Sequence, residues 1–128
     1  PFGSFEHPLD AAHLIAAAGA SYVSRWTTAH VDQLVETMKK AITTDGFAFI
    51  EVVSQCPTAF GKSAGLKTGL DILRWFKENS VLLQQAKKMD EKDLEGKIVV
   101  GEFVNRKLPS LTKAINKVRS VAKDAKKN

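Results

Sequence analysis

The sequence has a single cysteine, Cys56, among its 128 residues. One cysteine cannot close a disulfide within the chain, and it cannot by itself build a CxxC-type zinc site or hold an iron–sulfur cluster. No apolar run approaches the roughly 18 residues that a membrane-spanning helix requires. A chain so poor in cysteine is typical of a reducing compartment, so we expect a soluble cytoplasmic protein that does not enter a membrane.

A net positive charge is missing from most of the sequence, although the formal net charge of the whole is +5. Residues 105–128 contain eight basic residues and one acidic residue, so they carry +7 and leave −2 for residues 1–104. Apolar residues recur at helical spacing between Leu111 and Ala122, which predicts a basic amphipathic helix in this segment. The basic face of this helix is compatible with binding to nucleic acid, with binding to an acidic partner, or with simple exposure to solvent. Because no aromatic residue lies among the charges to stack on bases, we favour solvation and do not expect nucleic-acid binding.

The most regular part of the sequence is a strand, a helix and a second strand. Residues 20–26 and 47–53 have the composition of strands. Between them, five apolar residues follow helical spacing: Val31, Leu34, Val35, Met38 and Ile42. Such a unit predicts two parallel strands with a crossover helix. Further helices are predicted over residues 9–18, 66–78 and 81–89, and a third strand over 97–104. The sequence therefore predicts an α/β fold with a parallel βαβ core and flanking helices.

The loop over residues 54–65 begins at the carboxyl end of the second strand, where ligands bind in open α/β sheets. It contains Cys56, followed by Pro57, which restricts the turn. A lone cysteine is most often a small buried apolar residue. At a strand end it is also well placed to ligate a metal or to act as a redox-active thiol. These alternatives stay open on the local sequence alone.

Two other patterns carry no site. Gly61-Lys62-Ser63 follows a predicted strand, but a P-loop also needs a glycine at position 56, which is cysteine. The histidines His7, His13 and His30 do not share a helical or metal-ligand spacing, so we expect no histidine metal site.

Three segments of the sequence resemble one enzyme family. The first segment is PFGSFEHPLD, at the start of the sequence. The second runs from Ala17 to Lys62; it begins with AAGASYVSRW and ends with GFAFIEVVSQCPTAFGK. The third is LDILRWFKENS, over residues 70–80. Together they resemble the β subunit of the 2-oxoacid:ferredoxin oxidoreductases, downstream of its thiamine diphosphate motif. The resemblance covers residues 1–104, and SQCPTAFG is more similar to the 2-oxoglutarate branch than to the pyruvate branch.

The resemblance implies an oxidative decarboxylation. A 2-oxoacid, most closely 2-oxoglutarate, reacts with coenzyme A to give an acyl-CoA, carbon dioxide and reduced ferredoxin. The implied cofactors are thiamine diphosphate, Mg²⁺ and a 4Fe–4S cluster, of which Cys56 is the one ligand carried over to this sequence. The implied partners are the α subunit, with γ and δ subunits in complexes that contain them, together with ferredoxin.

The sequence departs from the family at the other cofactor positions. The three further cluster cysteines, the GDG motif and the asparagine that hold the diphosphate and magnesium do not occur in it. We therefore expect residues 1–104 to be the C-terminal part of a thiamine-diphosphate-binding domain and residues 105–128 to be a basic amphipathic helix. Such a fragment is not catalytic alone. The alternative is a stand-alone α/β binding module whose basic helix recruits nucleic acid or an acidic partner.

Overall fold

The computed structural model describes residues 8–125. Residues 1–7, which include most of the opening segment of the resemblance and His7, lie outside the described residues, as do Lys126 and Lys127. The elements in chain order are α1 (Ala11–Ala17), β1 (Tyr22–Thr27), α2 (Val31–Thr43), β2 (Ala48–Val53), the π-helical turn η1 (Pro57–Gly61), α3 (Gly69–Asn79), β3 (Ser80–Leu82), α4 (Leu83–Ala86), α5 (Glu91–Leu94), β4 (Ile98–Asn105) and α6 (Leu111–Ala125).

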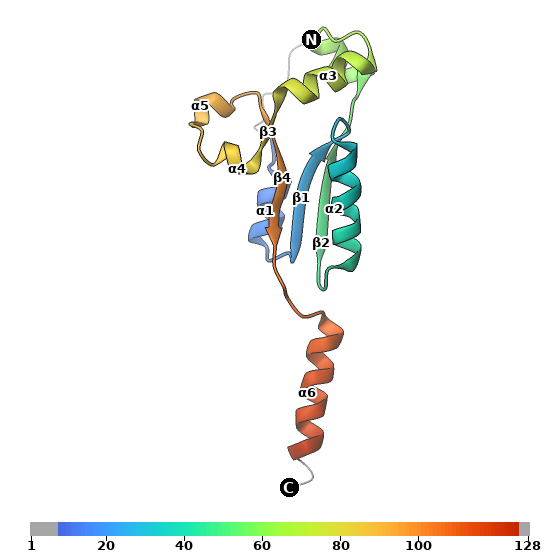
Figure 1. Cartoon of the computed structure of the whole chain (residues 1–128), viewed down its shortest axis with the longest axis vertical. Helices are drawn as coiled ribbons and strands as arrows, with labels where there is room; N and C mark the ends of the chain where they lie inside the picture. Colours follow the sequence, from blue (N-terminus) through green and yellow to red (C-terminus); the bar gives the residue numbers. More distant parts are fainter. Residues whose placement is uncertain (1–7, 126–128) are drawn as a thin grey trace.

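The strands form one sheet in the order β2-β1-β4-β3 (Figure 1). β1 and β2 are parallel, with register from Tyr22 opposite Ala48 to Thr27 opposite Val53. α2 connects them, so the predicted βαβ core is confirmed. β4 is the predicted third strand; it runs antiparallel to β1 and parallel to β3. The α/β fold with a parallel core and flanking helices is therefore the fold observed.

The two faces of β1 pack differently. One face places Val23 against Ala12 and Ala20, with Phe49 and Phe103 packed around them, in a small apolar core under α1. The other face meets α2 through polar groups. The indole Nε1 of Trp26 donates to Thr37 Oγ1 at 2.8 Å, and the Tyr22 hydroxyl donates to the same oxygen at 3.4 Å.

The apolar stripe of α2 does not face the sheet. Val31, Val35, Met38 and Ile42 are 41–84% exposed, whereas Thr37 is 2% exposed. Lys40 pairs with Glu102 of β4 from the side of the helix opposite this stripe. The spacing correctly predicted the helix, but these polar contacts to β1 and β4 set its rotation. The stripe therefore lies open along one side of the described chain.

The predicted helix over residues 81–89 is wrong in its first part. Ser80–Leu82 form strand β3, in which Val81 lies opposite Val99 and Leu82 opposite Val100. Only the four residues from Leu83 are helical, as α4. Pairing with a buried strand outweighs the local helical spacing because that spacing is a weak signal over one or two turns. A short helix, α5, also occupies part of the charged segment that follows.

The basic C-terminal helix is observed as α6, which extends away from the sheet (Figure 1). Its apolar side chains, including Leu111 and Val118, are exposed. Near its start, Lys113 forms an ion pair with Asp45, which lies two residues beyond the end of α2. Among the helices within residues 8–125, none combines the length and apolarity that crossing a membrane requires.

Candidate functional site

The turns that follow β1 and β2 lie together at the carboxyl edge of the parallel pair. The backbone N–H of Thr28 donates to the carbonyl of Val53 at 3.0 Å. The Thr28 hydroxyl donates to the side-chain oxygen of Gln55 at 2.6 Å. These bonds tie the residue before Cys56 to the turn after β1. The predicted cysteine loop thus lies at the sheet edge where the sequence placed it.

The thiol of Cys56 is exposed, so the commonest role of a lone cysteine, packing inside a core, does not apply in the described chain. Its sulfur lies 3.7 Å from Thr58 Oγ1. The backbone N–H of Ala59, then the Thr58 hydroxyl and the N–H of Phe60, hold the pKa of the Cys56 thiol below its ordinary value. These donors stabilise the thiolate, which is the form of a cysteine that binds metals and attacks electrophiles.

The turn η1 holds the thiol in place. The Gly61 N–H donates to the Cys56 carbonyl at 2.9 Å and closes the turn. A Cβ on Gly61 would lie 2.9 Å from the carbonyl oxygen of Leu66 and 3.0 Å from Ile72 Cδ1. Phe60 packs on Trp75 of α3, with ring centroids 5.1 Å apart. The cysteine loop is therefore packed onto α3 through its far end, while the sulfur stays accessible.

Within residues 8–125, no three histidine, cysteine or carboxylate side chains come together as a metal site. The described chain therefore offers Cys56 as one ligand. An accessible sulfur with converging donors has the chemistry of a single thiolate ligand to iron. The chain fits a cluster whose other ligands come from elsewhere.

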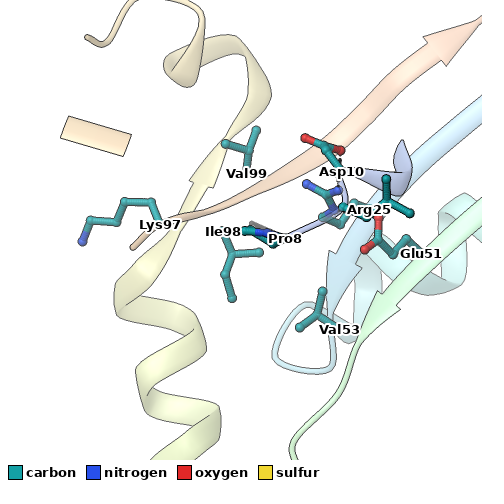
Figure 2. Close-up of a pocket in the computed structure, with 9 residues that line it drawn as sticks. Pro8, Asp10, Arg25, Glu51, Val53, Lys97, Ile98 and Val99 are labelled. Atoms are coloured by element: carbon teal, nitrogen blue, oxygen red, sulfur yellow. Dashed lines mark hydrogen bonds and ion pairs between the residues drawn. The ribbon is translucent and has the colours of Figure 1, made fainter. Parts of the chain in front are cut away.

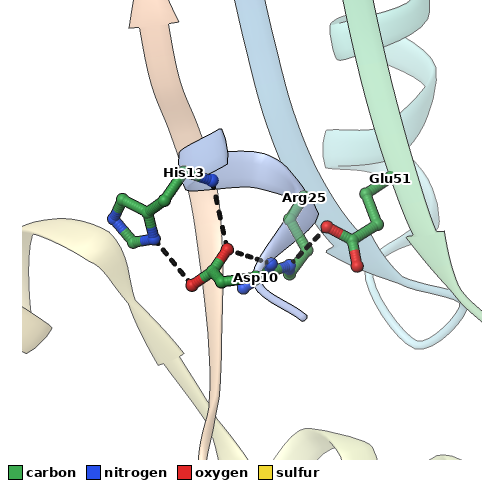
Figure 3. A network of polar contacts seen from close by, with 4 residues as sticks. All are labelled: Asp10, His13, Arg25 and Glu51. Atoms are coloured by element: carbon green, nitrogen blue, oxygen red, sulfur yellow. Dashed lines mark hydrogen bonds and ion pairs between the residues drawn. The ribbon is translucent and has the colours of Figure 1, made fainter. Parts of the chain in front are cut away.

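A polar network missed by the sequence analysis lies on the α1 side of the sheet. Figure 3 shows Arg25 between two carboxylates, with Nη2 at 2.7 Å from Asp10 Oδ1 and Nε at 2.8 Å from Glu51 Oε2. Asp10 also accepts from the backbone N–H of His13 at 3.1 Å and lies 2.7 Å from its Nδ1. Phe103 packs against both the Arg25 guanidinium and the His13 ring. His13 thus has a polar partner in Asp10 and an aromatic partner in Phe103, although its side chain is 61% exposed.

This network borders a pocket of about 390 Å³ (Figure 2). Arg25, Glu51 and Val53 lie on one side of it, and Lys97 and Ile98 lie on the other. The Arg25 side chain is 11% exposed and its charge is neutralised by both carboxylates. Arg25 therefore joins α1, β1 and β2, and no cation remains on it to attract an anionic ligand.

The charge of Asp10 should make stability depend on pH. Partial burial raises the pKa of Asp10, but hydrogen bonds from His13 and Arg25 outweigh burial and lower it from 3.8 to about 2. The carboxylate therefore stabilises the fold above about pH 4, and this contribution is lost as the pH falls through the interval between the two values. Since the side chain is nearly half exposed, we expect at most about 1 kcal/mol after solvent screening.

Urea unfolding of the wild type and Asp10→Asn checks this expectation. Asparagine retains one oxygen to accept from the His13 N–H and can still cap α1, so the pH dependence of the difference reports the charge. The wild type should be the more stable protein near pH 6, and the difference should shrink steadily toward about pH 2. A difference that stays constant over that range would show that the charge of Asp10 does not contribute.

Comparisons with known proteins agree with the resemblance. No protein-family model matches the chain. The 2-oxoglutarate synthase subunit KorB of Methanothermobacter thermautotrophicus is 50% identical over 115 residues, which are 90% of this chain and 40% of that protein. KorB of Methanocaldococcus jannaschii is 49% identical over 118 residues, 92% of this chain and 44% of that protein.

The fold also has a match among solved structures. It is similar to the 2-oxoglutarate:ferredoxin oxidoreductase from Magnetococcus marinus, solved with 2-oxoglutarate, coenzyme A and succinyl-CoA bound. The TM-score is 0.65 at 23% identity, covering 95% of this chain and 42% of that chain. This chain spans about two fifths of the length of the proteins it matches. The stand-alone binding module is therefore not favoured, and by sequence the chain is similar to part of the 2-oxoglutarate synthase KorB subunits.

Proposed function

We propose that the chain is part of the β subunit of a 2-oxoglutarate:ferredoxin oxidoreductase. In this proposal the complete complex converts 2-oxoglutarate and coenzyme A to succinyl-CoA and carbon dioxide and passes two electrons to ferredoxin. One observation carries this proposal. Over nine tenths of the chain, about half of the residues are identical to those of two KorB subunits. We do not propose that the chain alone is a catalyst, because its sequence lacks the motif that binds the diphosphate.

Cys56 is the residue through which we connect this chain to the chemistry. We propose that its thiolate is one of the four ligands of a 4Fe–4S cluster, and that the rest of the subunit supplies the other three. When bound, such a cluster supplies a one-electron relay toward ferredoxin. The described residues hold the sulfur accessible at the carboxyl edge of the sheet, fixed by the Thr28–Gln55 bond and by η1.

Thiamine diphosphate and Mg²⁺ belong, in the same proposal, to the part of the subunit outside this sequence. The αβ interface and any γ and δ subunits are likewise assigned to the complete assembly, which we place in the cytoplasm. The basic helix α6 is not part of the cofactor sites. We propose residues 1–104 as the portion of the cofactor-binding domain and residues 105–128 as a separate helical extension.

The test is a substrate-dependent assay of the assembled complex that contains this chain. We expect reduction of ferredoxin that requires both 2-oxoglutarate and coenzyme A, with succinyl-CoA formed in step with reduction. Pyruvate serves as the matched alternative substrate because it is also a 2-oxoacid but lacks the second carboxylate. Faster turnover with pyruvate would move the assignment to another branch of the family, and no reduction with any 2-oxoacid would reject it.

A further inference from the structure

The hydroxyl of Thr58 is the polar side-chain group beside the Cys56 sulfur. Thr58 Oγ1 lies 3.7 Å from Cys56 Sγ, within the range of a hydrogen bond to sulfur. Pro57 stands between the two residues as the first residue of η1 and has no N–H to offer. The Thr58 side chain therefore contacts the sulfur together with the backbone N–H groups of Ala59 and Phe60, whereas Pro57 offers no donor.

The geometry of this contact is fixed before any ligand arrives. The Cys56 carbonyl is held by the Gly61 N–H, and Gln55 is held by the Thr28 hydroxyl. The packing of Phe60 on Trp75 anchors the end of the turn. Thr58 and Cys56 are thus two residues of one short turn that is held at both ends.

Coordination would decide the direction of the hydrogen bond. In the free thiol either Cys56 or Thr58 can donate. A sulfur bound to iron as thiolate has no proton, so the threonine hydroxyl becomes the donor. Hydrogen bonds to a ligand sulfur withdraw electron density from it and favour the reduced state of the cluster, which raises its reduction potential.

We infer that Thr58 tunes the reduction potential of the iron–sulfur cluster by donating an O–H···S hydrogen bond to Cys56. This inference rests on the proposed role of Cys56 as a cluster ligand. Thr58 acts through the sulfur and is not a ligand itself. Without the hydroxyl the cluster should be harder to reduce, whereas its amount should not change.

Thr58→Val in the assembled complex tests this inference, because valine keeps the shape of threonine and removes the hydroxyl. A redox titration followed by electron paramagnetic resonance should give a more negative midpoint potential than wild type, outside the spread of repeat titrations. Thr58→Ser should restore the wild-type potential. Ser63→Ala is the matched control, since that hydroxyl lies in the same loop but donates to the Phe60 carbonyl at 3.0 Å.

Two outcomes would overturn the inference. The first is equal midpoint potentials for wild type and Thr58→Val at full cluster content. If valine lowers the cluster content, Thr58→Ala replaces it in the comparison with Thr58→Ser, and equal potentials for those two count in the same way. A cluster that persists unchanged in Cys56→Ser rejects the proposed ligand itself. Loss of the cluster there, together with no effect at Thr58, rejects only the tuning.

Discussion

Cys56→Ser in the complete subunit should abolish most of the cluster content of the complex. Iron in a 4Fe–4S cluster favours thiolate, a soft anionic ligand. The serine hydroxyl stays protonated near neutral pH and offers a harder oxygen in its place. The donors around position 56 that stabilise a thiolate do not provide enough help to ionise an alcohol, whose pKa is far higher. We therefore expect a large loss rather than a modest change in affinity.

Iron content per subunit and the electron paramagnetic resonance signal of the reduced complex measure this loss. Circular dichroism shows whether the variant remains folded, which is expected because the Cys56 side chain is exposed and contributes little to packing. Ser63→Ala, in the same loop, should keep its iron. An unaltered iron content and signal in Cys56→Ser would falsify the assignment of this residue as a ligand.

The parts of the fold that the sequence predicted correctly are those in which local pattern and tertiary packing agree. The run 47–53 is nearly continuous in apolar residues and became β2, and the apolar spacing around Val35 became α2. The cysteine loop followed because a loop after a parallel strand must begin at the carboxyl edge of the sheet. The resemblance to the enzyme family was recognised from longer sequence motifs and not from the periodicity of apolar residues.

The parts that the sequence did not predict depend on contacts between distant residues. Arg25 pairs with Asp10 and Glu51 only when α1 and β2 have packed next to β1. No spacing in the sequence predicts these ion pairs. Thr37 is the buried polar residue of α2, although its neighbours suggest that the apolar stripe would be buried. In both cases the position of a polar group is determined by partners that are distant in the sequence. A local sequence pattern does not include those partners.

Gly61 should be the glycine of the cysteine loop least tolerant of substitution. In Gly61→Ala the added methyl group would meet the Leu66 carbonyl oxygen at 2.9 Å and Ile72 Cδ1 at 3.0 Å. Ile72 is fully buried, and a backbone oxygen cannot rotate away as a flexible side chain can. Relieving the contact requires the turn to move away from α3. We expect a loss of about 1–3 kcal/mol, the usual cost of inserting a methyl group into a packed site.

Denaturant unfolding of Gly61→Ala and Gly69→Ala separates this steric cost from the general effect of replacing glycine. Nothing lies within 4 Å of a Cβ at Gly69, the first residue of α3, so alanine there should be neutral or stabilise by up to about 1 kcal/mol. The two substitutions add the same methyl group, yet Gly61→Ala should lower the unfolding midpoint whereas Gly69→Ala should leave it unchanged or raise it. Because η1 closes through the Gly61 N–H and the Cys56 carbonyl, a turn displaced by alanine also displaces the sulfur. Equal midpoints for the two variants would mean that η1 is not packed against Leu66 and Ile72 in solution, and the position of Cys56 would then have to depend on the Thr28–Gln55 bond and the Phe60–Trp75 contact.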